Sequence, residues 1–225
     1  MKSSLVILFS AISFTLSAQS TRDVSVNFIP VYKGELFELD KEVEKYNTTI
    51  IKLKFYLCHI GFSNSDTEGW IENNSYHLLD IEEPESMSIE LQVPDDLVAN
   101  SLNFNLGVDS LINVSGAMSG DLDPMHGMYW AWQSGYINFK VEGKSNKCPA
   151  RKNKFQFHLG GFLAPNNALQ NVSLPIIIKD EFFVIFDIGE LIETVDVSKT
   201  YEIMSPRHEA VVMAQKVASL FKIVE

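Results

Sequence analysis

The hydrophobic pattern of the chain is dominated by a period of two, in short runs separated by turn residues. Val24, Val26 and Phe28 alternate with polar neighbours, which is typical of a strand with one buried face. Seven further apolar runs follow, and the longest is almost continuous. They span residues 50–62, 87–93, 102–108, 136–141, 155–159, 172–178 and 182–188. Eight short strands with Gly, Pro, Asn and Asp between them predict an all-β fold, an antiparallel β-sandwich.

The pattern predicts one short helix, near the C-terminus. Ser205 suits the N-cap, and Pro206 suits the first helical position. An apolar stripe at helical spacing follows, formed by Val211, Val212, Ala214, Val217, Ala218 and Leu220. The segment 39–46 also has the composition of a short helix.

The N-terminus has the layout of a secretory signal peptide. Lys2 precedes an apolar stretch over residues 5–16, and Ser17 and Ala18 form a small-residue cleavage site before Gln19. Cleavage after Ser20 is the alternative. No later run approaches the roughly 20 apolar residues that span a bilayer. We therefore expect a signal peptide over 1–18, a single domain over 19–225, no membrane span, and a periplasmic or secreted protein of bacterial origin.

Charge and cysteine content narrow the class of partner. The formal net charge of −11 disfavours binding to nucleic acid or to anionic lipid.

Cys58 and Cys148 can form a disulfide in an oxidising compartment, or they can stay two buried thiols that behave as small hydrophobes. The sequence leaves both alternatives open.

One segment concentrates the residues that suit copper. Residues 123–136 hold Met125, His126 and Met128 together with two of the three tryptophans, Trp130 and Trp132. Imidazole and thioether are copper ligands, and thioether favours Cu(I). The alternative is that the aromatic residues fill a core and that the histidine is solvated.

The phase of this segment conflicts with the strand after it. An extended chain would place Met128, Trp130 and Trp132 on one face. The strand after Gly135 buries residues of the other phase, among them Phe139. Either a bulge near Gly135 reverses the side chains, or the tryptophans face away from the main core.

Two further histidines are candidate ligands. His158 lies on the polar face of the strand 155–159. His208 lies at the start of the C-terminal helix, where the helix dipole disfavours an imidazolium and leaves a neutral nitrogen for a metal. His59 sits inside an apolar strand and is expected to be a hydrogen-bonded core histidine, and His77 is placed outside the site.

Catalytic motifs are absent from the sequence. It contains no Gly-x-Ser-x-Gly, no His-Glu-x-x-His and no phosphate-binding loop. The cysteine, histidine and methionine spacing of a blue-copper site is also missing. We therefore do not expect an enzyme.

The order of several motifs resembles the MbnP-like copper-binding family. The main match is Met128-Tyr129-Trp130-Ala131-Trp132-Gln133-Ser134-Gly135-Tyr136, followed by Phe139 and Glu142-Gly143. Weaker matches are Val26-Asn27-Phe28, Lys54-Phe55-Tyr56-Leu57, Phe104-Asn105-Leu106-Gly107-Val108 and Phe157-His158-Leu159-Gly160. The resemblance covers nearly the whole chain after the signal peptide.

The resemblance implies a β-sandwich that binds copper through histidines. In some members a kynurenine, made from a tryptophan by a dihaem peroxidase-like partner, is a further ligand. It therefore implies that His126 and His158 are the leading ligands and that Trp130 or Trp132 is the candidate for oxidation. The chain has two cysteines where some relatives have four.

Together these observations predict a periplasmic copper-binding protein that acquires, carries or buffers copper. Met125, Met128 and His208 complete the expected ligand set. The alternative is a metal-free sandwich that binds a ligand or a partner on an aromatic platform. That platform would consist of Tyr129, Trp130, Trp132 and Tyr136. Convergence of the three histidines would favour copper.

Overall fold

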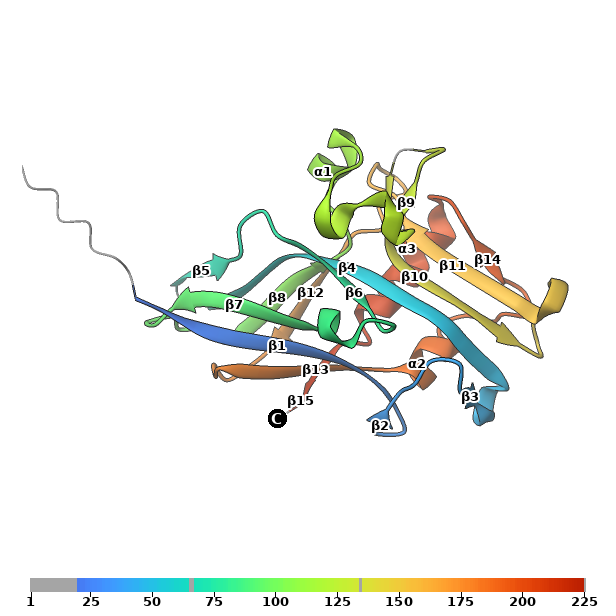
Figure 1. The fold of residues 1–225 in the computed structure, drawn as a ribbon, viewed down its shortest axis with the longest axis horizontal. Coiled ribbons are helices and arrows are strands. Elements are labelled where there is room, and N and C mark those ends of the chain that lie inside the picture. The colour runs from blue at the N-terminus through green and yellow to red at the C-terminus, as the bar shows by residue number, and fades with distance from the viewer. Residues whose placement is uncertain (1–19, 65–66, 134, 225) are drawn as a thin grey trace, which may run out of the picture.

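Two β-sheets lie one over the other in the computed structural model, which describes residues 20–64, 67–133 and 135–224 (Figure 1). In this part of the chain the smaller sheet has five strands and the larger has ten. The smaller sheet consists of β1 (Thr21–Tyr32), β2 (Glu35–Leu36), β7 (Ser88–Pro94), β13 (Glu181–Asp187) and β15 (Lys222–Val224). The signal-peptide prediction over residues 1–18 lies outside the described residues.

The larger sheet is built around one long strand, β4 (Thr48–Asn64), and its neighbours β8 (Ser101–Leu106) and β10 (Gly135–Ser145). β12 (Gln170–Pro175) pairs with β8, and β11 (Lys154–Gly160) pairs with β10 and β14 (Glu202–Ile203). The remaining strands are β3 (Glu42–Val43), β5 (Thr67–Ile71) and β6 (Tyr76–Asp80) on β4, and β9 (Tyr129–Trp130) on β10.

All eight predicted strands are present, so the all-β sandwich is confirmed. The sheets are not wholly antiparallel, because β1 runs parallel to β13 and β11 runs parallel to β14. Both parallel pairs join segments more than 40 residues apart in the sequence. Long connections of this kind are what parallel pairing requires.

The described residues form three α-helices, not one. α1 (Ser110–Ser115) and α2 (Ile188–Glu193) have six residues each, too few to show a periodic apolar stripe. The predicted C-terminal helix is α3 (His208–Ala218), but Arg207 is its N-cap and no side chain caps it, so Ser205 and Pro206 precede it. The segment 39–46 forms β3 and a short 3₁₀ turn. The 3₁₀ turns are η1 (Glu44–Tyr46), η2 (Pro84–Met87), η3 (Gly120–Leu122), η4 (Pro124–His126) and η5 (Arg151–Asn153).

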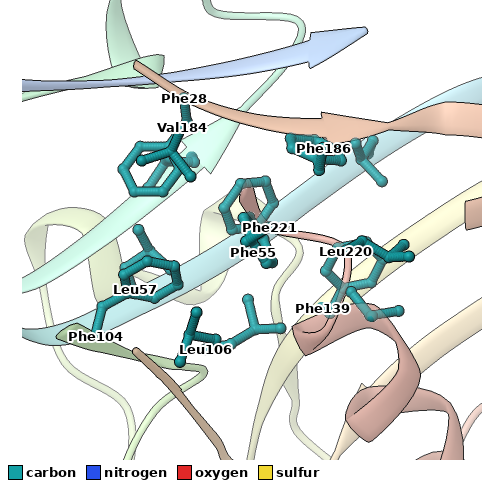
Figure 2. Packing of buried hydrophobic residues seen from close by; sticks show 14 of the residues in the cluster. Phe28, Phe55, Leu57, Phe104, Leu106, Phe139, Val184, Phe186, Leu220 and Phe221 are labelled. Atoms are coloured by element: carbon teal, nitrogen blue, oxygen red, sulfur yellow. The ribbon is translucent and has the colours of Figure 1, made fainter. Parts of the chain in front are cut away.

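The main core fills the space between the two sheets and is rich in phenylalanine. Phe55 of β4 is fully buried, and its ring lies 5.7 Å from the rings of both Phe186 and Phe221 and 5.8 Å from that of Phe139 (Figure 2). Phe221 follows α3, so the C-terminal segment closes this core. Edge-on and offset ring pairs of this kind add to the burial of apolar area.

A second apolar cluster lies on the opposite, outer face of the larger sheet. Phe55 and Leu57 point into the main core, so Tyr56 between them points outward. We call this second group the outer-face cluster: Tyr56, Leu78, Val108, Leu122, Met128, Trp130, Tyr136 and Ile137. The segment 107–130, with α1 and β9, covers that face at one end of the sheet (Figure 1).

A bulge in β10 lets one strand supply both clusters. The pairing of β10 with β11 loses register between Ile137 and Phe139. Ile137 belongs to the outer-face cluster and Phe139 belongs to the main core. Both alternatives from the sequence therefore hold: β10 is bulged, and Trp130 faces away from the main core.

None of the helices in the described residues has the length and apolarity needed to cross a bilayer.

We predict that Phe55→Ala lowers the free energy of unfolding by about 3–5 kcal/mol, because it removes a fully buried ring and leaves a cavity. Phe183→Ala is the matched control: this ring on β13 is 36% exposed, and we expect a loss of about 1 kcal/mol. Urea unfolding followed by circular dichroism measures both. Equal losses in the two variants would contradict the placement of Phe55 at the centre of the core.

Candidate functional site

A buried histidine–carboxylate pair lies on the outer face of the larger sheet. His158 of β11 is 6% exposed, and its Nε2 lies 2.8 Å from Oε1 of Glu142 on β10. Lys140 Nζ lies 3.5 Å from the same oxygen. The hydrogen bond from His158 and the charge of Lys140 lower the pKa of Glu142 to about 2 against the opposing effect of burial. His158 is therefore on the face that the sequence predicts, but it is buried and paired instead of solvated.

Trp130 lies next to this pair on the same face. Gly160 follows His158 by two residues in β11, so both face outward. A Cβ on Gly160 would lie 2.8 Å from Cζ3 of Trp130, which shows that the indole rests directly on this glycine. Trp130 therefore packs on β11 two residues beyond His158, on the outer face of the sheet.

The indole N–H of Trp130 has no hydrogen-bond partner. The side chain is 5% exposed, and its Nε1 is buried without an acceptor. A buried donor without a partner costs about 1–3 kcal/mol, and such atoms are rare enough to require an explanation. This atom is the clearest local sign of strain at the site.

Trp132 has a different environment. β9 ends at Trp130, and residues 131–133 form a turn, with Gln133 N–H bound to the carbonyl of Trp130 at 3.3 Å. Met128 is fully buried, whereas Trp132 is 67% exposed. The expectation that Met128, Trp130 and Trp132 share one strand face is therefore wrong. The two indole rings still lie only 6.0 Å apart, centroid to centroid.

The loop that carries His126 is joined to the histidine–carboxylate pair through Lys140. His126 is exposed at the end of η4, and its Nε2 lies 3.1 Å from the carbonyl oxygen of Gly120. Lys140 donates to the carbonyl oxygen of Gly127 at 2.9 Å. Met125, which precedes His126 on this loop, is 89% exposed. The ammonium group thus bridges the methionine–histidine loop to Glu142.

A pocket of about 300 Å³ opens beside Trp130. Gly135, Phe162 and Pro206 are among the residues that line it. Pro206 belongs to the segment that leads into α3, where His208 is exposed at the first helical position. The pocket therefore borders the Trp130 turn and the segment that precedes the third predicted histidine.

The three predicted histidines do not form a ready-made ligand set. Among the described residues, the histidine, cysteine and carboxylate ligand atoms converge in one group of three, with all atoms within 4.8 Å of one another. That group is Cys58, His59 and Asp109. The expected convergence of three imidazoles is therefore not observed, and the assignment of His126, His158 and His208 as ligands stays a prediction, as it does for Met125 and Met128.

The sequence pattern does not predict this group, because His59 stands in an apolar run that is typical of a buried strand. His59 is exposed and has a φ of 53°, at a point where β4 loses register with β8. No period-two pattern reveals such a bulge. Cys58 and Cys148 are both buried and free, which rules out the disulfide alternative. Burial and the nearby Asp109 carboxylate raise the pKa of the Cys58 thiol to about 12.

The proposed aromatic platform is not formed. Tyr136 is fully buried, and its hydroxyl donates to the carbonyl of Leu122 at 3.0 Å and accepts from the N–H of Met118 at 3.0 Å. Trp130 is buried as well, so the four aromatic residues do not present one exposed surface. Trp132 is the member of the set that solvent reaches most.

We predict that Glu142→Gln destabilises the metal-free protein by about 1–2 kcal/mol at pH 7, because it removes one charge from a partly buried pair. The pKa of Glu142 is lower in the folded protein than the usual value near 4.3. Its contribution is therefore complete above about pH 5 and is lost as the pH falls toward 2. Urea midpoints at several pH values test this, with exposed Glu90→Gln as the control. A difference between wild type and Glu142→Gln that stays constant down to pH 2 would contradict the depressed pKa.

Comparison with known proteins places the fold. A family model described as MbnP matches residues 21–205. The structure is similar to that of MbnP from Methylosinus trichosporium, with a TM-score of 0.59 and 15% identity, over 85% of this chain and 87% of that one. At this identity the structural likeness establishes the fold alone. A search of curated proteins gives no match. Because the family model covers most of its length, the chain belongs to the MbnP family.

Proposed function

We propose that this protein is a periplasmic copper carrier or buffer whose site lies on the outer face of the larger sheet, around His158 and Trp130. One observation carries the proposal. A buried, carboxylate-bound histidine lies two residues along β11 from the glycine on which a buried tryptophan with an unpaired N–H packs. Membership of the MbnP family supports the proposal, because the sequence motifs resemble those of copper-binding proteins.

The pairing with Glu142 suits His158 for metal binding. A ligating histidine commonly donates its other ring N–H to a carboxylate, which fixes the tautomer and makes the free nitrogen a better ligand. With Nε2–H donating to Glu142, Nδ1 carries the lone pair. Burial of the ring at 6% exposure limits its rotation. His158 is thus an oriented imidazole ligand before any metal arrives.

Trp130 can become a ligand only by oxidation. An indole N–H is a donor and has no lone pair for a cation. Two molecules of hydrogen peroxide convert tryptophan to N-formylkynurenine and two waters, and hydrolysis then releases formate and leaves kynurenine. The product has an aniline nitrogen and a ketone oxygen, both of which bind copper. A dihaem peroxidase-like partner is the class of protein that would use peroxide in this way.

The neighbouring Trp132 gives the oxidation a route. Trp130 is too buried for direct contact with a partner protein, but the largely exposed ring of Trp132 lies 6.0 Å from it. An electron taken from Trp132 at the surface can be replaced from Trp130. On this ground we assign oxidation to Trp130 and relay to Trp132. Trp70 packs against Phe62 at 6.2 Å, on the main core, and has neither role.

Apart from Met128, the remaining candidate ligands lie at exposed positions. His126 gives up one hydrogen bond, to the Gly120 carbonyl, when it turns toward a metal. Met125 is already exposed on the same loop, while Met128 is buried in the outer-face cluster and would ligate only after local rearrangement. His208 would join from the start of α3. A site assembled partly by such movement suits a protein that releases its ion.

We predict that His158→Ala weakens copper binding at least tenfold, because it removes the oriented imidazole. His77→Ala is the matched control, since His77 also pairs with a carboxylate, that of Glu72, with 2.7 Å between Nε2 and Oε2. Competition titrations with Cu(I) and Cu(II) chelators on metal-free protein measure both. If His158→Ala binds copper as wild type does, or if wild type binds none, the carrier proposal fails at this site and the pocket beside Trp130 becomes a candidate site for an organic ligand.

We also predict that protein isolated from its native periplasm carries kynurenine at position 130. The expected mass change of that peptide is a gain of one oxygen and a loss of one carbon. Tandem mass spectrometry locates the change, and Trp70 and Trp132 are internal controls. An unmodified Trp130 in copper-loaded native protein would show that histidines and methionines bind copper alone.

A further inference from the structure

Three side chains of different chemistry meet where the segment 107–130, the long loop, leaves the larger sheet. None of the three belongs to the proposed copper site. Cys58 and His59 are consecutive in β4, and Asp109 immediately precedes α1. Their ligand atoms lie within 4.8 Å of one another. Cys58 Sγ and His59 Nδ1 are 3.1 Å apart.

A bulge brings two consecutive side chains to the same place. Successive residues of a strand normally point to opposite faces. Here β4 shifts its register against β8 between Cys58 and Gly61, and His59 adopts a φ of 53°. Left-handed conformations are unfavourable for most residues other than glycine, and histidine is among the few that adopt them more often. The result is an imidazole turned toward the thiol and exposed on its other side.

Asp109 is held in a fixed orientation. Its Oδ1 accepts from the N–H groups of Leu111 and Ile112 at 2.8 and 3.1 Å. Its Oδ2 accepts from the hydroxyl of Tyr76 at 2.5 Å. A carboxylate has about four lone-pair positions, so one on Oδ2 is left. None of the ion pairs among the described residues includes Asp109, so no lysine or arginine neutralises it there.

We propose that Cys58, His59 and Asp109 bind a zinc ion, with water as the fourth ligand. Zinc accepts sulfur, nitrogen and oxygen donors together, in a tetrahedral arrangement. The Cys58–His59 pair needs to open only from 3.1 Å to about 3.5 Å to fit zinc bond lengths of about 2.3 Å to sulfur and 2.0 Å to nitrogen. Copper suits the set less well, because a carboxylate is a hard ligand for Cu(I) and the two histidines and one cysteine of a blue-copper site are not present here.

Zinc in this position would tie the long loop to the sheet. β4 is the central strand of the larger sheet, and Asp109 stands at the beginning of the segment 107–130 that covers the outer-face cluster. The bound ion would therefore fix the root of the loop that carries His126. The inference does not rest on copper binding, because it uses none of the residues proposed for copper.

The zinc site is tested by titrating the metal-free, reduced, full-length mature protein with Co²⁺ as a spectroscopic probe. Zn²⁺ is then added as the competitor. We expect one Co²⁺ per chain, a thiolate-to-cobalt absorption band in the near ultraviolet, and loss of the band on addition of Zn²⁺. Cys58→Ser should abolish the band and weaken binding at least tenfold. His59→Asn should weaken binding by a similar factor, since asparagine tolerates the backbone conformation but removes the imidazole.

Two controls separate this site from other thiols and from copper. Cys148→Ser removes the other buried free thiol, and His158→Ala removes the leading copper ligand; both should bind Co²⁺ as wild type does. Unfolding midpoints in the presence of a chelator check that each variant is folded. If Cys58→Ser does not fold, the His59→Asn variant, which changes an exposed residue, provides the test instead. The proposal is overturned if wild type shows no thiolate band with millimolar Co²⁺, if Cys58→Ser keeps the band, or if either control loses it.

Discussion

The structure depends on one constraint: β10 must bury side chains on both faces of the larger sheet. The bulge at Asn138 satisfies it by moving Ile137 outward while Phe139 stays in the main core. The side-chain Oδ1 of Asn138 accepts a hydrogen bond from the N–H of Val108 at 3.1 Å. Gly107, with a φ of 122°, packs so closely on Asn138 that a Cβ would lie 2.4 Å from its Cγ. The bulge and the start of the long loop therefore fix each other.

The outer-face cluster also sets the electrostatics beside it. His158, Glu142 and Lys140 lie at the edge of an apolar surface and are largely shielded from water. Charged hydrogen bonds are stronger in such surroundings than in water. This explains why Glu142 remains ionised despite burial. It also places an oriented imidazole next to an indole that has found no acceptor.

The two proposed metal sites differ in the softness of their donors. Imidazoles, thioethers and a kynurenine around His158 suit copper, whereas the thiolate, imidazole and carboxylate around Cys58 suit zinc. Both sites involve the segment 107–130, one at its root and one along its length. That segment packs on the sheet through apolar contacts. A zinc ion at its root would therefore restrict the part of the segment that carries His126 toward the proposed copper site.

The sequence by itself determined the sandwich, because burial on one face of a strand leaves a period of two that can be read directly. It also marked His158 and Trp130 through their motifs. It could not place His59 or Trp132, since a left-handed residue at a bulge and a turn after two strand residues both break the period. Nor could it bring Asp109 to Cys58, which lies 51 positions earlier in the printed sequence. Only the tertiary structure decided those contacts, because strand pairing and loop packing join residues whose proximity leaves no local pattern.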